Sequence, residues 1–143
     1  MTLSQQQKEE RNVACIEKWA KSWSKPGGSA ATMVDECYAD VVEVLAVLQG
    51  KSVVQGSEGK DRWRAVEIDI ERQYERRTLT FSNIVAQGDA VAVEGAVEMV
   101  ATDGSQRGWP FAVFFKFDSE GRIMSDHTYM PDSPHTDALT ATV

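Results

Sequence analysis

The sequence predicts a single α+β domain in which helices gather on one face of a curved, mostly antiparallel sheet. Helical patterns occupy most of the chain before Thr78, whereas the apolar residues from Thr78 to Met130 recur with the period of two that is typical of strands. A chain of 143 residues can bury its own core without disulfides or a structural metal. We therefore expect one domain over residues 1–143, with a loose tail from about residue 132.

The clearest element is a β-hairpin between Gly108 and Pro131. Gly121 ends the turn at its tip, where a glycine can adopt a positive φ. The second strand of the hairpin carries thioethers, an acid and a hydroxyl on one face, which suits a cavity wall. The first strand places large apolar side chains on one face, which we expect to meet the core: Phe111, Val113, Phe115 and Phe117.

The other elements are predicted from hydrophobic periodicity, capping residues and turn residues. Their order is two helices, a strand with both faces covered, a brief strand, a third helix and two strands that precede the hairpin. The ranges are Ser4–Ser24, Ser29 to about Cys37, Val41–Leu48, Val53–Val54, Glu58–Arg77 with Tyr74 on its apolar stripe, Thr78–Ala86 and Asp89–Thr102.

Composition excludes several classes of function. The formal net charge of −7 argues against a nucleic-acid partner, because binding to phosphates needs basic patches. The small basic cluster of Arg72, Arg76 and Arg77 is explained by ion pairs on a solvated helix face. No window resembles a membrane span, so we expect a soluble cytoplasmic protein. Cys15 and Cys37 are expected to be two small buried side chains.

The order of elements resembles the nuclear transport factor 2-like superfamily, and within it the SnoaL-like proteins. Two short motifs carry the resemblance: Tyr38-Ala39-Asp40 before a β-branched strand, and the pattern F-x-x-x-G-x-I from Phe117 to Ile123. The resemblance implies a cone, also described as a cystatin-like α+β roll. Its members include polyketide cyclases, ketosteroid isomerases, limonene-epoxide hydrolases and scytalone-type dehydratases, so the fold does not select a reaction.

The catalytic residues of these relatives are not preserved as a set at the matching positions. The general base of the isomerases falls near Ala46, and the tyrosine on their first helix falls near Trp19. The acid in the last strand of the hydrolases and cyclases falls at Thr128. The resemblance therefore implies the fold and leaves the reaction open.

The same placement predicts which side chains look into the cone. Glu94, Glu98 and Asp126 are the candidate catalytic acids, since a carboxyl in an apolar pocket has a raised pKa. Acids that alternate with alanines can instead face solvent or pair with arginine. The candidate substrate-binding residues are Trp19, Trp63, Val44, Ala46, Val113, Phe115, Thr128 and Met130, although Trp63 and Phe115 also suit ordinary core positions. No metal or organic cofactor is expected.

Three functional hypotheses follow. The first is a cofactor-free isomerase, cyclase or dehydratase that acts on a small hydrophobic, oxygenated molecule through Glu98 and Asp126, with Trp19 positioning the substrate. The second is a non-catalytic binder of such a molecule, and the third is a protein-interaction module. We also expect a homodimer through the outer face of the sheet, on which we place Phe114, Ile123, His127 and Tyr129.

Overall fold

The computed structural model describes residues 2–46, 51–54 and 59–130, so the predicted tail from about residue 132 lies outside the described residues. Within these described ranges, three helices and six strands follow one another in the predicted order. The helices are α1 (Gln5–Trp23), α2 (Ala30–Cys37) and α3 (Gly59–Glu71). The strands are β1 (Tyr38–Ala46), β2 (Lys51–Val54), β3 (Tyr74–Gln87), β4 (Ala90–Ala101), β5 (Gln106–Phe117) and β6 (Ile123–Tyr129).

Both N-terminal helices begin at the serines that the sequence indicates. The hydroxyl of Ser4 accepts the backbone N–H of Gln7 at 3.2 Å, and the side chain of Gln7 accepts the backbone N–H of Ser4 at 2.9 Å. Ser29 caps α2 by accepting the N–H of Thr32 at 3.0 Å. The predicted starts of α1 and α2 are confirmed.

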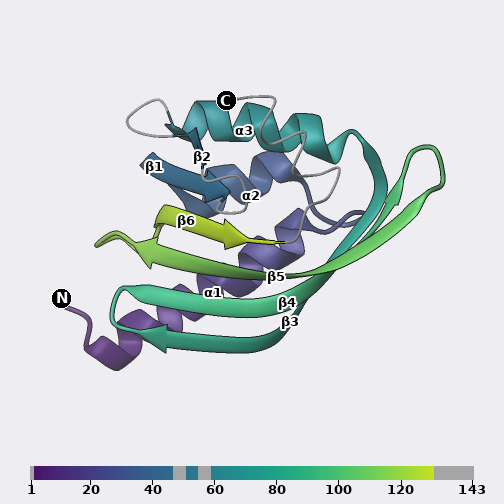
Figure 1. Cartoon of the computed structure of the whole chain (residues 1–143). Helices are drawn as coiled ribbons and strands as arrows, with labels where there is room; N and C mark the ends of the chain where they lie inside the picture. The colour runs from purple at the N-terminus through teal and green to yellow at the C-terminus, as the bar shows by residue number, and fades with distance from the viewer. Residues whose placement is uncertain (1, 47–50, 55–58, 131–143) are drawn as a thin grey trace.

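The six strands form one sheet in the order β2-β1-β6-β5-β4-β3. All neighbouring strands are antiparallel except β1 and β6, which are parallel and both lie inside the sheet, away from its edges. Figure 1 shows that β3, β4 and β5 are long and bend together around α1, while α3 covers the end of the sheet that contains β1. The predicted α+β architecture with helices on one face is confirmed.

The third helix is shorter than predicted. It ends at Glu71, and Tyr74, which we expected on its apolar stripe, is the first residue of β3. The backbone of Tyr74 and Arg77 pairs with β4, and Arg77 also forms a two-way backbone bridge with Lys25 at 2.9 and 3.0 Å. These tertiary hydrogen bonds prevail over the local helical pattern.

The basic cluster that we placed on a solvated helix face is also divided. Arg72 stays near the end of α3 beside Asp69, with 3.6 Å between Nη1 and Oδ1. Arg77 instead has no exposed surface. Its guanidinium carbon lies 4.2 Å from the ring centre of Trp23. The interpretation of this residue as a surface charge was wrong.

The second strand of the hairpin is irregular at its start. A register shift occurs opposite Lys116 and Phe117, so that Ile123 is fully buried and Met124 is 45% exposed. The prediction that Ile123 lies on the outer face was wrong. From Asp126 onwards the expected alternation holds.

The core lies between the helices and the concave face of the sheet. Phe115 is 1% exposed and meets the ring of Trp19 edge to face, with 5.2 Å between ring centroids. Its neighbour in sequence, Phe114, is 57% exposed on the opposite face.

Among the described residues, no helix is long and apolar enough to span a bilayer.

The contrast between these two phenylalanines provides a test of the packing. Replacing Phe115 with alanine removes a buried ring and leaves a cavity, so the free energy of unfolding should fall by about 3 to 5 kcal/mol in urea melts. Phe114→Ala, compared at a protein concentration at which both variants are monomeric, is the matched control and should cost less than about 1 kcal/mol. Equal losses in the two variants would contradict the assignment of the faces.

Candidate functional site

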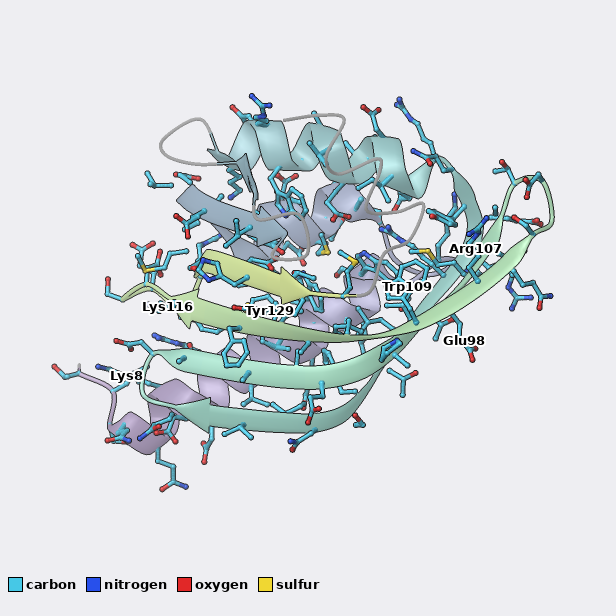
Figure 2. All side chains as sticks on the ribbon, viewed as in Figure 1. Lys8, Glu98, Arg107, Trp109, Lys116 and Tyr129 are labelled. Atoms are coloured by element: carbon cyan, nitrogen blue, oxygen red, sulfur yellow. The ribbon has the colours of Figure 1, made fainter. Side chains whose placement is uncertain are left out.

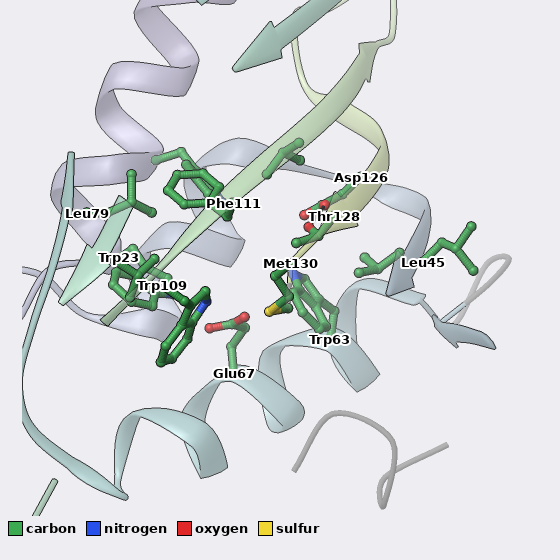
Figure 3. A pocket seen from close by; sticks show the side chains of 14 residues that line it. Trp23, Leu45, Trp63, Glu67, Leu79, Trp109, Phe111, Asp126, Thr128 and Met130 are labelled. Atoms are coloured by element: carbon green, nitrogen blue, oxygen red, sulfur yellow. Dashed lines mark hydrogen bonds between the residues drawn. The ribbon is translucent and has the colours of Figure 1, made fainter. Parts of the chain in front are cut away.

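A cavity of about 70 Å³ lies between α1, α3 and the concave face of the sheet (Figure 3). Most of its wall is apolar, and two acids and one hydroxyl interrupt it. All four tryptophans of the chain line it: Trp19 and Trp23 from α1, Trp63 from α3 and Trp109 from β5. Such a concave, aromatic wall with few polar groups is the usual form of a small-molecule site.

Asp126 is the acid on the sheet side of this cavity, and its side chain is held by two hydroxyl groups. Tyr38 Oη donates to Asp126 Oδ2 at 2.7 Å, and Thr128 Oγ1 donates to Asp126 Oδ1 at 2.7 Å. Trp19 Nε1 in turn donates to Tyr38 Oη at 3.0 Å. The carboxylate is therefore fixed by donors from β1 and β6 and, through the tyrosine, by α1.

Burial decides the electrostatics of this network. Asp126 is 2% exposed, and burial raises the pKa of its carboxyl, although the hydrogen bonds from Tyr38 and Thr128 and the nearby His127 act in the opposite direction. Burial and the neighbouring carboxylate raise the pKa of Tyr38 well above its ordinary value. Tyr38 therefore stays a hydrogen-bond donor at any physiological pH.

Glu67 is the acid on the helix side. It lies one turn after Trp63 on α3 and is 4% exposed. Burial raises the pKa of Glu67 to about 7, with Arg77 acting against that shift and the charges of Asp126 and Glu71 adding to it. The carboxyl group is thus poised between its neutral and charged forms near neutral pH.

Arg77 supports Glu67 from behind without a hydrogen bond to it. The distance between Arg77 Nη1 and Glu67 Oε2 is 3.8 Å, close enough for charge attraction and too long for a hydrogen bond. Arg77 Nη2 lies 3.5 Å from Glu71 Oε2, so one guanidinium is shared by two acids. Glu67 Oε2 has no hydrogen-bond partner among the described residues, which leaves it available to a bound molecule.

The two buried acids approach the cavity from opposite sides. Figure 3 shows Glu67 rising from α3 between Trp63 and Trp109, with Asp126 across the space on the sheet. Their surroundings differ, because Asp126 accepts two hydroxyl hydrogen bonds, whereas Glu67 Oε2 accepts none from the part of the chain that the structure describes. Environments that stabilise one carboxylate more than its neighbour are those that separate a base from an acid.

Most of the residues predicted to bind substrate do line this cavity: Trp19, Trp63, Val44, Val113, Thr128 and Met130. Phe115 does not line it and instead packs in the core beside Trp19. Ala46 ends β1, and its side chain lies outside the described part of the structure. The roles of these residues in binding stay predictions.

Two of the three predicted catalytic acids face the wrong way. Glu94 and Glu98 are exposed, and Figure 2 shows Glu98 pointing away from the helices. In the pairing of β4 with β5, Val93 lies opposite Val113 and Glu98 lies opposite Gly108, so odd residues share the inner face. Our placement was shifted by one residue, which turns every side chain to the other face.

Sequence reasoning missed Glu67 and Tyr38. Glu67 stands among the apolar positions of α3, four residues after Trp63, and an acid on the apolar stripe of a helix is a detectable signal. Tyr38 belongs to the motif that carried the family resemblance, although its hydroxyl was given no role. Among the described residues, no three histidine, cysteine, aspartate or glutamate side chains are grouped to hold a metal ion.

A family comparison agrees with this architecture. The model of the SnoaL-like domain family matches residues 17–125, which is most of the chain. The chain belongs to the SnoaL-like family. A search among curated proteins gives no significant match.

Solved structures show the same SnoaL-like fold at low sequence identity. An LEH-like epoxide hydrolase from M. tuberculosis is 15% identical, with a TM-score of 0.71 over 94% of this chain and 92% of that chain. A protein from Jannaschia sp. CCS1, described as a SnoaL-like polyketide cyclase, is 15% identical, with a TM-score of 0.68 and the same coverage. SalBIII, an epoxide hydrolase/cyclase-like enzyme of pyran ring formation in salinomycin, is 17% identical, with a TM-score of 0.62 over 88% and 92% of the two chains.

The raised pKa of Glu67 predicts how stability depends on pH. The folded protein binds this proton up to a pH of about 7, whereas the unfolded chain releases it near 4.3, so the free energy of unfolding falls as the pH rises between these values. Glu67→Gln removes this contribution. The difference in stability between wild type and Glu67→Gln should therefore change by about 4 kcal/mol across that interval and stay constant above it.

Urea melts at half-unit steps of pH measure this difference in the free energy of unfolding. Glu67→Gln also removes a partner of Arg77, but that loss adds the same amount at every pH and does not affect the pH dependence. Glu98→Gln removes the same charge from the outer face and controls for net charge. Parallel pH profiles for wild type and Glu67→Gln would refute the assignment of the raised pKa.

Proposed function

We propose that the protein is a cofactor-independent acid/base enzyme of the isomerase, cyclase or dehydratase type, acting on a small, apolar, oxygenated molecule. The observation that carries the proposal is the pair of buried carboxyls, Glu67 and Asp126, on opposite walls of one tryptophan-lined cavity. Burying two acids without a salt bridge of good geometry costs stability, and such a cost is typical of functional sites.

The surroundings of the two acids support distinct roles. Asp126 is the proposed general base, because its oxygens accept hydrogen bonds from Tyr38 and Thr128 that favour the charged form. Each oxygen keeps a second lone pair that can accept a proton from a substrate C–H or O–H group. Tyr38, which accepts a hydrogen bond from Trp19, fixes the direction in which Asp126 Oδ2 points.

Glu67 is the proposed general acid. With a pKa of about 7, a substantial fraction of the carboxyl is protonated at neutral pH and can donate to a carbonyl, hydroxyl or epoxide oxygen. Arg77 stabilises the carboxylate that remains after transfer, through a charge attraction across 3.8 Å. The indoles that surround Glu67 keep water away and strengthen both interactions.

The names of similar structures support this class of reaction. Epoxide hydrolysis, polyketide cyclisation and pyran ring formation all combine proton removal at one oxygen or carbon with protonation at another. A second candidate, a non-catalytic binding protein, is favoured by Ala46 and Thr128, which stand where the relatives have a general base and an acid. The free volume of the cavity is about 70 Å³, which holds only a few water molecules. A small substrate, or a modest opening of the cavity, is required by the enzyme hypothesis.

The test uses nuclear magnetic resonance to follow two simple probes, deuterium uptake by cyclopentanone in D2O and hydrolysis of cyclopentene oxide. Turnover that falls at least about 100-fold in both Asp126→Asn and Glu67→Gln would support the assigned roles. Glu94→Gln is the control, because Glu94 is exposed on the outer face of the same sheet. Turnover that survives both buried substitutions would reject the proposal, and binding without turnover in the wild type would favour the binding protein.

We also propose a homodimer through the outer face of the sheet. Val41, Met124 and Tyr129 are 59%, 45% and 43% exposed there, and Phe114 meets Tyr129 edge to face at 5.8 Å. His127, on the same face, contacts Glu43 at 2.6 Å between Nε2 and Oε1. A cluster of exposed apolar groups on adjacent strands is typical of a protein interface.

Sedimentation equilibrium at micromolar concentration tests this dimer. Wild type is expected at twice the 15.8 kDa chain mass, and Phe114→Glu should shift it towards the monomer because a charge would be buried in the interface. Val85→Glu, at an exposed position of β3 near the far edge of the sheet, is the matched control. A wild-type monomer at all concentrations would reject the dimer.

A further inference from the structure

The two cysteines of the chain lie against each other between α1 and α2. Cys15 Sγ is 3.9 Å from the carbonyl oxygen of Cys37, and Cys37 Sγ is 3.9 Å from the carbonyl oxygen of Cys15. Each sulfur thus reaches the backbone of the other residue. The two residues are therefore near neighbours across the two elements, and a disulfide would require their Cα atoms to lie about 4.4 to 6.8 Å apart. The sequence predicted two small buried side chains and did not indicate that they are in contact.

The two thiols differ in access and in acidity. Cys15 is partly exposed and Cys37 is fully buried. The contact with Cys37 lowers the pKa of Cys15, and the cationic Lys18, Arg122 and Arg11 lower it further against the effect of burial. The contact with Cys15 and burial raise the pKa of Cys37.

A partly exposed thiol among cations is the usual environment of a reactive cysteine, whereas a buried cysteine without such neighbours is inert. A second thiol beside it can resolve an oxidised first thiol. We propose that Cys15 and Cys37 are a redox-reactive pair, which a hydroperoxide converts into an intramolecular disulfide between α1 and α2. Nothing in the acid/base chemistry of the cavity requires these two thiols.

The proposed reaction has two balanced steps. The Cys15 thiolate attacks one oxygen of the peroxide, and the O–O bond breaks. The other oxygen leaves as hydroxide or alkoxide and takes up a proton, while the sulfur becomes a sulfenic acid. Cys37 then loses its proton and attacks the Cys15 sulfur, so that the S–S bond forms, the S–O bond breaks and water leaves. Two electrons pass from the thiol pair to the peroxide, and a dithiol reductant reverses the change.

The pair adjoins the residues that hold Asp126. Cys37 directly precedes Tyr38, and Cys15 lies four residues, about one helical turn, before Trp19 on α1. The bond from Trp19 Nε1 to Tyr38 Oη joins α1 to the first residue of β1, which directly follows the end of α2 that the disulfide would tie to α1. A shift in the spacing of α1 and α2 on oxidation would move the donor of the 2.7 Å hydrogen bond to Asp126.

The first test treats the full-length protein with one equivalent of hydrogen peroxide at pH 7. We expect both thiols to disappear together in a chromogenic thiol assay, with a mass loss of two hydrogens in the monomeric chain and full recovery after dithiothreitol. Cys37→Ser should stop at a sulfenic acid that dimedone traps, and Cys15→Ser should lose its remaining thiol at least about tenfold more slowly. Thiols that persist in the wild type, or disulfides only between chains, would overturn the proposal.

These readouts do not depend on catalysis, so they distinguish failure of the thiol proposal from failure of the proposed acid/base function. Thermal melts of both serine variants establish that they fold, and alanine variants at the same positions replace any that do not. The effect of the disulfide on the cavity is measured by the fluorescence emission of Trp19, in a variant whose other three tryptophans are replaced by phenylalanine. Oxidation should change that emission in a chain with both cysteines and leave it unchanged in Cys15→Ser, and an unchanged emission in both would overturn the link.

Discussion

The hydrogen bond from Tyr38 to Asp126 joins the parts of the molecule that make the cavity. Tyr38 begins β1 immediately after α2, and Asp126 lies on β6, the parallel neighbour of β1. Trp19 extends the connection to α1. One buried carboxylate thereby receives its orientation from two strands and a helix, and its desolvation is offset by hydroxyl donors rather than by a cation.

Charge balance explains why the second acid behaves differently. Arg77 is the nearby buried cation that faces the acids of α3, and it is shared between Glu67 and Glu71. Its other face contacts the ring of Trp23. Partial neutralisation of this kind leaves Glu67 with a weak partner and a pKa of about 7, whereas a close bidentate pair would have kept it charged. The raised pKa of Glu67 therefore depends on the long distance of 3.8 Å between its Oε2 and Arg77 Nη1.

The sequence was sufficient for the fold and for about half of the site. Alternation in β5, the capping serines and the turn glycines depend on local physics, so Val113 and the starts of α1 and α2 were predicted correctly. The facing of β4 depends on its register with β5, which local alternation of acids and alanines does not determine, and Glu94 and Glu98 were misplaced for that reason. Arg77 was misplaced because a tertiary strand pairing replaced a helical pattern. Glu67 is visible in the sequence as an acid on an apolar helix stripe, but its place opposite Asp126 depends on the neighbours of α3, which the sequence does not give.

The parallel pairing of β1 with β6 also determines when the site can exist during folding. Tyr38 and Asp126 are 88 residues apart in the chain, so their hydrogen bond closes one of the longest loops in the fold. The hairpins β3-β4 and β4-β5 involve much shorter separations and can form earlier. A chain still emerging from the ribosome without β6 would hold Tyr38, Trp19 and most of the apolar wall, and would lack the carboxylate that they orient. We therefore expect the site to be assembled late in folding, after the local hairpins have formed.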